Sequence, residues 1–468
     1  MVRSLIVAFA VFVRMAGLLY GQSPDFAAIR RETVEHFTSL LKIDTSNPPG
    51  NETKAALYVQ AVLEREGIPA KLLTHTEGRA NLVARLPGTG RKRPILIMGH
   101  TDVVGVQREK WSFDPFAAIR KDGYIYGRGA LDDKDNLTAG LMVMVTLKRL
   151  GVKLDRDVIF VAEAGEEGNS LVGINFLVEK HWDQIDAEYC LAEGGGGLRR
   201  AGKPIYMTVA TAEKVPRGAT LISRGTAGHG SAPRLDNAVV HLAGAVARVA
   251  EWQPPMRLND TTRAYFERLA AISTPEQARR YREIVLPGKA PAIESYFRQH
   301  DIMHNSILRT SVSPNVIKAG FRSNVIPSEA EAILDIRALP DENMEQFFQQ
   351  MRRVINDPQI EVVPNPGGRP TGQPSRVDTD LFRLLEATQK KIYPGAATLP
   401  YMLTGATDMA QLRARGVQSY GVGPLVEEKD QLLGGAHGDD EKILEQSLHQ
   451  FVEFLWVTVR EIAAVANP

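Results

Sequence analysis

The chain has 468 residues, which is long enough for two or three domains, and its composition is that of an ordinary globular protein. Hydrophobic residues make up 44% of it, charged residues 24%, and the formal net charge is +1. This charge balance disfavours nucleic acid and anionic lipid as partners. A single cysteine, Cys190, excludes an internal disulfide and a cysteine-rich structural zinc site.

The first two dozen residues have the layout of a secretory signal peptide. A positive charge at Arg3 precedes an apolar run from Leu5 to Val13, and Gly21 is a small residue at which cleavage is expected. The apolar run is too short to span a bilayer. We therefore expect residues 1–21 to be removed and the protein to be secreted or periplasmic, without a membrane span. The alternative is a frayed N-terminal helix, or a translation start at Met15.

Helices and short apolar strands alternate in the first part of the chain. Helical spacing of apolar residues occurs in segments 25–41, 52–67 and 136–150, and strand-like runs occur in 80–86, 94–99 and 157–162. Short buried strands separated by helices predict an α/β domain with a largely parallel sheet. We assign residues 24–214 to it, together with residues 366–468, where the pattern resumes.

The segment between these two parts has a different pattern. Its predicted elements are a strand (218–225), a helix (237–252), two strands (316–326 and 331–338), a helix (344–355) and a strand (360–363). This βαββαβ order is that of a ferredoxin-like unit, so residues 215–365 are expected to form an inserted lid or dimerisation domain. A segment at about 255–305, rich in Arg, Glu and Ala, is expected to be helical and exposed.

The first candidate catalytic or metal-binding residues follow the predicted strand 94–99. His100 comes directly after this strand, at the edge where ligands gather in open α/β sheets. Asp102 lies two positions later, on the same face of an extended segment, where it can accept the second N–H of the imidazole. Taken alone, His-x-Asp indicates no more than a hydrogen-bonded loop histidine.

Further acidic residues have a similar glycine-rich setting. Asp132 and Asp133 follow two glycines, and the two oxygens of Asp133 can bridge two ions. In the pair Glu166–Glu167, one glutamate can bind metal while its neighbour acts as a base. Glu193 precedes four glycines, and His437 lies far downstream among glycine and acidic residues. Each signal alone fits a solvated turn equally well, but imidazole and carboxylate together suit zinc or a similar divalent ion.

Five motifs carry a family resemblance: GHTDVV, GRGALDDK, GEEG, AEGG and AHGDDE. In order and approximate spacing they resemble the two-zinc metallopeptidase family of aminoacylase, carboxypeptidase G, carboxypeptidase S and succinyl-diaminopimelate desuccinylase. The resemblance covers essentially the whole chain after the signal segment. It implies a hydrolase that cleaves a peptide or amide bond with two divalent ions, zinc or, in its place, cobalt or manganese.

The resemblance also implies a ligand set, carried over by position. His100, Asp133 and Glu193 would bind one ion, and Asp133, Glu167 and His437 would bind the second. Asp133 would therefore be the bridging ligand, shared by both ions.

The resemblance also implies roles for residues of these motifs that do not bind metal. Glu166 would be the general base, Asp102 would orient His100, and the peptide bond between Asp132 and Asp133 would be cis. The sequence departs from the family pattern at Asp135, where a glycine is common, and at Gly165, where an acid is frequent. Neither departure removes a ligand.

Three residues of the lid segment and one after it match positions that act on substrate. His229, in GTAGHGSAP, resembles a lid histidine that helps stabilise the oxyanion, in dimers often from the partner subunit. Asn324 and Arg337 match substrate contacts, and the planar guanidinium of Arg337 suits a carboxylate. Thr407, in TGATD, resembles a loop that borders the substrate pocket. A turn histidine and a surface ion pair are the alternatives for His229 and Arg337.

These matches imply a small peptide or N-acyl amino acid with a free carboxylate as substrate, and a homodimer formed through the lid. A carboxypeptidase or dipeptidase and an N-acyl-amino-acid deacylase would use the same site, so both activities stay open. A non-catalytic binding protein of the same fold is a remote alternative, disfavoured because every expected ligand and Glu166 are present. A metal-dependent phosphate-ester hydrolase is also disfavoured, because it would need a phosphate cradle or a more basic pocket and the sequence indicates neither.

Overall fold

The computed structural model describes residues 24–286, 288–431 and 435–465, so the predicted signal segment 1–21 lies outside it. The chain forms two compact units. The first comprises its part up to residue 205 with residues 379–396 and 423–468, and the second comprises residues 206–378 and 397–422. Within the described ranges, no helix combines the length and the apolar character that a membrane crossing requires.

The first unit contains a run of neighbouring strands of a mixed sheet, in the spatial order β2 (Ala70–Thr76), β3 (Arg79–Leu86), β8 (Val158–Glu163), β4 (Ile95–His100) and β9 (Tyr189–Ala192). The pairs β8–β4 and β4–β9 are parallel, whereas β2–β3 and β3–β8 are antiparallel. All residues of β4 and β8 are buried, which explains their continuous apolar runs. The predicted α/β fold is confirmed, with an antiparallel edge beside its parallel centre.

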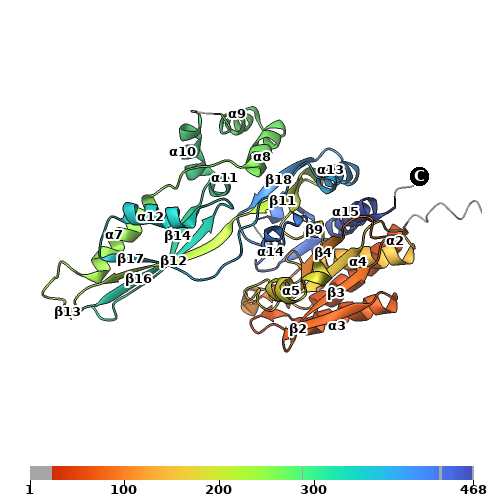
Figure 1. Ribbon diagram of the computed structural model, residues 1–468, viewed down its shortest axis with the longest axis horizontal. Helices are drawn as coiled ribbons and strands as arrows, with labels where there is room; N and C mark the ends of the chain where they lie inside the picture. The colour runs from red at the N-terminus through yellow and green to blue at the C-terminus, as the bar shows by residue number, and fades with distance from the viewer. Residues whose placement is uncertain (1–23, 287, 432–434, 466–468) are drawn as a thin grey trace, which may run out of the picture. The chain divides into compact units, whose positions relative to one another are not determined.

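Helices surround this sheet (Figure 1). Helix α4 (Lys134–Arg149) packs against β4, contacts α2 (Phe26–Leu41) and α15 (Glu445–Ala463), and is buried along almost its whole length. Asp25 caps α2 by accepting hydrogen bonds from the N–H groups of Ala27 and Ala28. The remaining elements of this unit are α3 (Glu52–Arg65), α5 (Ile174–Lys180), α6 (Trp182–Ile185), α13 (Asp380–Ile392), β1 (Ser46–Asn47), β5 (Val103–Val104), β6 (Ile119–Lys121), β7 (Tyr124–Tyr126), β10 (Gly196–Arg200), β20 (Leu425–Glu427), β21 (Lys442–Leu444) and two 3₁₀ turns, η1 (Arg108–Lys110) and η2 (Glu428–Asp430).

The second unit contains an antiparallel sheet in the order β14 (Ser311–Ala319), β16 (Glu329–Ala338), β12 (Val215–Arg224) and β17 (Ile360–Pro364). Two contacting helices, α7 (Ala238–Glu251) and α12 (Met344–Ile355), pack on it (Figure 1). Their apolar faces and the strands share one buried core. Chain order and spatial order are those of the predicted βαββαβ unit.

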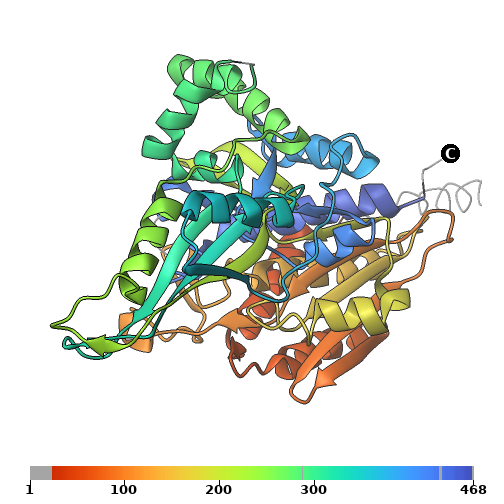
Figure 2. The same cartoon turned by 60° about the vertical axis from the view of Figure 1, so that its left-hand side comes forward.

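The predicted insert is helical, as expected, with α8 (Asp260–Ala271), α9 (Pro275–Glu283), α10 (Ala290–His300) and α11 (Ile302–Ile307) (Figure 2). It is more than an exposed segment, because its helices share a buried apolar core with Ala212, Leu339 and Met402 of the same unit. Phe266, Tyr281 and Phe297 lie around the ring of His304 in this core, with ring centroids 5.1–5.4 Å from it. The remaining elements of this unit are β11 (Lys203–Glu213), β18 (Ala397–Leu403), β19 (Gln418–Gly421) and α14 (Met409–Ala414).

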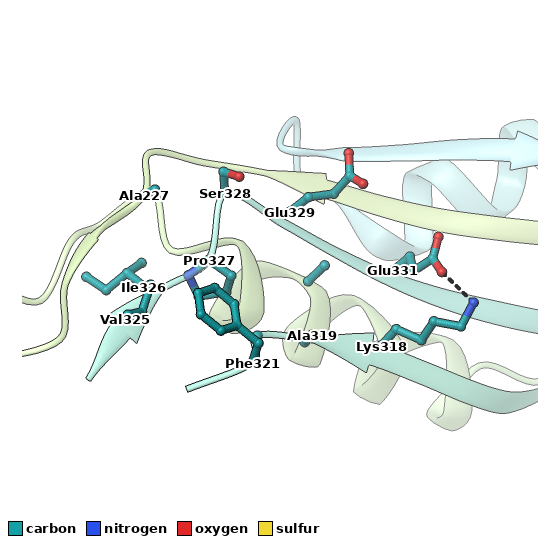
Figure 3. A pocket seen from close by; sticks show the side chains of 12 residues that line it. Ala227, Lys318, Ala319, Phe321, Val325, Ile326, Pro327, Ser328, Glu329 and Glu331 are labelled. Carbon is teal, nitrogen blue, oxygen red and sulfur yellow. Dashed lines mark ion pairs between the residues drawn. The ribbon is translucent and has the colours of Figure 1, made fainter. Parts of the chain in front are cut away.

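The prediction of one strand over residues 316–326 is wrong. Strand β14 ends at Ala319, and a separate short strand, β15 (Val325–Ile326), pairs with β13 (Gly228–His229). Gly320 has a φ of +61°, a left-handed conformation that turns the chain at this point. A pocket of about 410 Å³ lies beside this turn and is lined by Phe321, Pro327 and neighbouring residues (Figure 3).

Candidate metal centre

The expected ligands all lie in the first unit, where several follow the strands of its sheet. His100 is the last residue of β4, Glu166 and Glu167 follow β8, and Glu193 follows β9. Because these three strands are parallel neighbours, their carboxyl ends meet at one edge of the sheet. The other side chains come from loops next to α4 and β21.

Asp132 lies between two histidines. Its Oδ1 atom is 2.9 Å from His100 Nε2, and its Oδ2 atom is 2.9 Å from His437 Nε2. The Nε2 atom of His437 is also 2.7 Å from Glu167 Oε1. Each carboxylate oxygen of Asp132 therefore faces a different imidazole.

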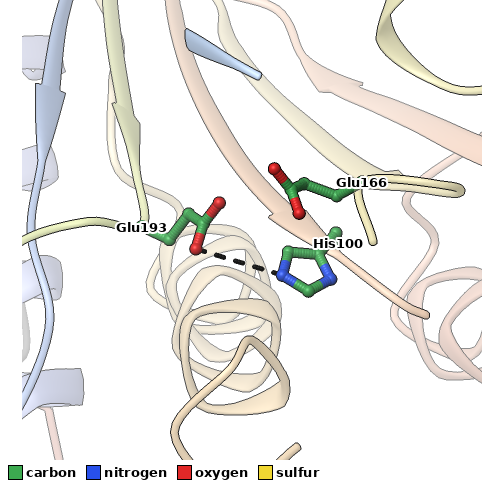
Figure 4. A group of neighbouring side chains, drawn as sticks. All are labelled: His100, Glu166 and Glu193. Atoms are coloured by element: carbon green, nitrogen blue, oxygen red, sulfur yellow. Dashed lines mark ion pairs between the residues drawn. The ribbon is translucent and has the colours of Figure 1, made fainter. Parts of the chain in front are cut away.

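Two glutamates complete the cluster on the His100 side. Figure 4 shows Glu166 and Glu193 directed toward the imidazole of His100, with Glu193 Oε2 4.0 Å from His100 Nε2. One ligand atom from each of these three residues lies within 4.8 Å of the other two, and the same holds for His100, Asp132 and Glu167. These are distances over which one cation can contact several donors.

Asp133 does not take the bridging position, and this corrects the expected ligand set. Its carboxylate is fully buried and turned toward α4. There it accepts hydrogen bonds from the backbone N–H of His100 at 3.2 Å and from Asn136 Nδ2 at 2.6 Å. The peptide bond between Asp132 and Asp133 is cis, as the resemblance implied. Asp132 is the member of the pair that faces both histidines.

Asp102 orients His100 and also holds the loop that carries the two glutamates. His100 Nδ1 donates to the backbone oxygen of Asp102 at 2.9 Å, and the Asp102 carboxylate lies 3.5 Å away. That carboxylate accepts the backbone N–H groups of Gly165, Glu166 and Glu167 at 3.0, 3.1 and 3.0 Å. One buried charge thus links the end of β4 to the loop after β8.

Asn47 is a residue of this network that sequence reasoning missed. Its Nδ2 donates to Asp102 Oδ2 at 2.9 Å. The contact arises because β1, which ends at Asn47, pairs with β5 just after Asp102. The only local signal was the turn-forming Pro48–Pro49–Gly50 that follows, and this signal does not indicate a partner.

The hydrogen-bond chemistry at His100 provides a test of whether a cation fits here. Because Nδ1–H donates to a carbonyl oxygen, a neutral ring has a lone pair at Nε2. This lone pair would face a lone pair of Asp132 Oδ1 at 2.9 Å unless a proton or a cation lies between them. Two imidazoles and four carboxylates are donors that suit zinc and related divalent ions.

The electrostatics of the cluster agree with an excess of negative charge. Burial opposes protonation of His100, but hydrogen bonds to Asp102 and Asp132 raise its pKa well above the usual value. Hydrogen bonds to Asp132 and Glu167 raise the pKa of His437 to about 10. Burial, together with the charges of Glu166 and Asp132, raises the pKa of Glu193 well above its usual range. Bound cations would balance this charge in place of protons.

In the second unit, the structure brings His229 and Asn324 together. His229 lies in the β13–β15 ladder opposite Val325, and the backbone N–H of Gly230 donates to the oxygen of Asn324 at 2.9 Å. His229 Nδ1 lies 2.7 Å from Ser231 Oγ, so the ring is already oriented by its own loop.

Arg337 and Thr407 lie elsewhere in that unit. Arg337 is near the far end of β16, where Nε is 2.9 Å and Nη2 3.3 Å from the carboxylate oxygens of Asp335. The buried hydroxyl of Thr407 donates to Glu213 Oε2 at 2.7 Å, and Arg413 Nη1 binds the same oxygen at 2.7 Å. The structure therefore does not place Arg337 beside His229 and Asn324.

The sequence model of peptidase family M20/M25/M40 matches residues 96–461, a range that includes Asp132 and both histidines of the cluster. The chain belongs to this family. The predicted family is confirmed, and with it the prediction of a hydrolase that acts on amide or peptide bonds. Members of this family include peptidases with a dinuclear metal site, and the cluster described above supplies candidate ligands for such a site.

Individual relatives agree with this assignment. The N-fatty-acyl-amino acid synthase/hydrolase PM20D1 of Homo sapiens is 27% identical over 387 residues, which are 80% of this chain and 75% of the human protein. The M20 family metallo-carboxypeptidase Sso-CP2 of Sulfolobus solfataricus has a TM-score of 0.68 at 19% identity, over 92% of this chain and 99% of that chain. The Bacillus subtilis YXEP protein, a dinuclear metal binding peptidase, has a TM-score of 0.58 at 15% identity, over 93% and 99% of the two chains. The two structures show that the fold is shared.

Proposed function

We propose that this M20 hydrolase binds two zinc ions around Asp132 and cleaves the amide bond of a small peptide or N-acyl amino acid that has a free carboxylate. One observation carries the proposal: the two oxygens of Asp132 lie 2.9 Å from His100 Nε2 and 2.9 Å from His437 Nε2. A single carboxylate placed between two imidazoles in this way has one oxygen for each of two ions.

The remaining donors divide between the two sides of Asp132. His100 and Glu193 would hold one ion, and His437 and Glu167 would hold the other, with Asp132 shared. When bound, the two ions supply Lewis-acid chemistry, which polarises the amide carbonyl and makes water a better nucleophile.

Glu166 is the proposed general base. Its side chain lies in the group with His100 and Glu193, and its backbone N–H is fixed by Asp102 Oδ1 at 3.1 Å. From this position Glu166 would take a proton from the attacking water and deliver it to the leaving amine. Fixing the backbone of a base through a buried charge limits the positions that its carboxylate can reach.

Two substrate classes fit this chemistry. Similarity to a metallo-carboxypeptidase supports peptides as substrates of this chain. Similarity to the human N-fatty-acyl-amino acid synthase/hydrolase supports N-acyl amino acids. Both classes have a carboxylate next to the scissile amide, and the guanidinium of Arg337 would bind it in competition with Asp335. Thr407, held by Glu213, would border the pocket for the rest of the substrate.

The test is a substrate panel with and without metal. Dipeptides and N-acyl amino acids are incubated with wild-type protein, with protein stripped by a chelator, and with stripped protein after zinc is restored. We expect turnover of at least one class, its loss on stripping and its return with zinc. Glu166→Gln should keep the metal and lose turnover by about 10²–10⁴-fold. Turnover that survives stripping, or normal turnover in Glu166→Gln, would contradict the proposal.

The second unit favours a homodimer in which His229 acts on the partner's substrate. Arg337 lies eight residues after Glu329, the first residue of β16, and His229 lies beyond that end of the strand. At 3.3 Å per residue, eight residues of strand span roughly 26 Å, so Arg337 and His229 are at least about that far apart along the strand. A dipeptide extends over about 7 Å, so it cannot contact both residues of one subunit. Ile317 on β14 and Phe321 beside it are 59% and 84% exposed, which fits a surface covered by a second copy.

Export belongs to the same proposal. Residues 1–21 have the sequence pattern of a cleaved signal peptide, and the protein would act outside the cytoplasm. Mass spectrometry of the mature N-terminus tests this point, and retention of residue 1 in the exported protein would contradict it.

A further inference from the structure

The two loops that carry Asp132 and His437 start from paired strands of the first unit. In the antiparallel pair β7–β21, Tyr126 lies opposite Lys442. One loop leaves β7 and reaches Asp132, and the other carries His437 and enters β21. The backbone N–H of Gly127 donates to the backbone oxygen of Glu441 at 2.9 Å, which continues the ladder into both loops.

A buried carboxylate connects the loops beyond this ladder. The side chain of Glu441 is fully buried, and its Oε1 accepts the backbone N–H of Leu131 at 2.7 Å. Its Oε2 accepts the N–H of Gly129 at 3.2 Å and the guanidinium of Arg128, through Nη1, at 2.5 Å. Leu131 directly precedes Asp132, so this charge fixes the backbone that leads into the shared ligand.

Arg128 extends the connection to the other ligand. It is only 3% exposed, its guanidinium lies 5.2 Å from the ring centre of Trp111, and its Nη2 donates to the backbone oxygen of His437 at 3.4 Å. His437 has a φ of +62°, a conformation that residues with a side chain rarely adopt. The bond from Arg128 holds the carbonyl of this strained residue.

Stability alone does not explain this ion pair. Taking two charges out of water is costly, and apolar side chains of similar volume often stabilise a core as well or better. What distinguishes the pair is where its hydrogen bonds go: to the residue before Asp132 and to the backbone of His437 itself.

We propose that Glu441 and Arg128 are positioning residues, which hold the loops of Asp132 and His437 at the separation at which both side chains bind the same ion. The pair thereby sets the affinity of the His437 side of the centre. This inference rests on the proposed function, because it presupposes that the two side chains are metal ligands.

Zinc affinity of the metal-free protein, measured by competition with a chromophoric chelator, tests the inference. Glu441→Gln keeps the size of the side chain but removes its charge and one acceptor. We expect one of the two zinc ions to bind 10- to 100-fold more weakly, a loss typical of residues that orient metal ligands. The other ion, which shares only Asp132 with this side of the centre, should be weakened less.

Glu52→Gln is the matched control. Glu52 is fully buried in the same unit and forms an ion pair with Arg79, which is also buried. This substitution should lower the melting temperature of the metal-free protein while both zinc affinities stay at the wild-type values. A general loss of packing would therefore be distinguished from a loss of ligand positioning.

The outcomes separate the inference from the function on which it rests. A wild-type chain that binds no zinc would remove the proposed function. If the wild-type chain binds two ions and Glu441→Gln binds both as tightly as the wild type does, the positioning role alone would be overturned. If Glu441→Gln does not fold, Arg128→Lys decides, because lysine can pair with Glu441 but lacks the fork that also reaches His437. Unchanged zinc affinities in Arg128→Lys would then overturn the inference.

Discussion

At the scale of single residues, hydrogen-bond partners decide which of two adjacent aspartates can bind metal. Asp133 has its oxygens occupied by the N–H of His100 and by Asn136, and it lies where α4 begins. Among the described residues, the carboxylate oxygens of Asp132 face the imidazole nitrogens of His100 and His437, and Glu167 lies in the same group. To turn toward the two histidines, the buried carboxylate of Asp133 would have to leave these N–H groups unpaired, at a cost of about 1–3 kcal/mol.

His241 illustrates a residue whose charge stabilises the second unit. Its Nδ1 is 2.8 Å from Asp357 Oδ2, and its Nε2 is 3.0 Å from the backbone oxygen of Leu235. Both partners are acceptors, so the protonated ring can donate to both. The hydrogen bond to Asp357, followed by that to Leu235, raises the pKa of His241 above 6.5. Arg248, 3.6 Å from Asp357, shares the same carboxylate.

The sign of the pH dependence follows from this direction. The pKa of His241 is higher in the folded than in the unfolded protein, so its charge stabilises the folded state fully below pH 6.5. This contribution is lost as the pH rises through the pKa of the folded state. We expect His241→Gln to lower the free energy of unfolding by about 0.5–1 kcal/mol at pH 5.5, for this partly exposed pair, and by less at pH 8.5. Urea denaturation at both pH values measures the difference, and an equal loss at the two pH values would contradict this account.

Sequence alone could predict part of the residue set. His100, Glu166 and Glu167 were accessible because each follows a predicted strand of a parallel sheet, whose ends must meet. Glu193 was accessible only through its glycine-rich motif. Asn47, Arg128 and the carboxylate of Glu441 were not, because their contacts depend on how distant loops fold. The choice between Asp132 and Asp133 was equally out of reach, since both side chains are identical and only the local backbone separates them.

At the scale of elements, strand ends and strand pairs bring the centre together. The parallel neighbours β8, β4 and β9 bring three ligand loops to one edge, and the pair β7–β21 adds the loops of Asp132 and His437. Buried carboxylates then tie these loops in pairs: Asp102 joins the loops after β4 and β8, and Glu441 joins the other two. Such cross-links would hold the proposed ligands in place before a cation binds.

Element types were predicted well where apolar periodicity was strong and poorly where tertiary contacts decide. The helix over 344–355 was predicted at its observed bounds, because its apolar face has a clear period of 3.6 residues. The strand over 316–326 was wrong, because a run of strand-forming residues does not reveal that Gly320 turns the chain. The burial of the insert's apolar residues was also missed, since it depends on how its helices pack with one another and with β11 and β18.

At the scale of the whole molecule, the separation of His229 from Arg337 leads to a test of the proposed dimer. In a mixture of Glu166→Gln and His229→Ala chains, half of the dimers should be mixed. Each mixed dimer would contain one complete site, in which the His229→Ala chain supplies Glu166 and the Glu166→Gln chain supplies His229. We expect the mixture to recover about one quarter of the wild-type turnover. A mixture no more active than the mean of its components would place His229 in its own subunit.

The most direct test of the central claim is an anomalous diffraction map of zinc-loaded crystals, recorded at the zinc absorption edge. The account predicts two peaks, one on either side of the Asp132 carboxylate, with His100 beside one and His437 beside the other. A single peak, or two peaks that share Asp133 instead of Asp132, would contradict it.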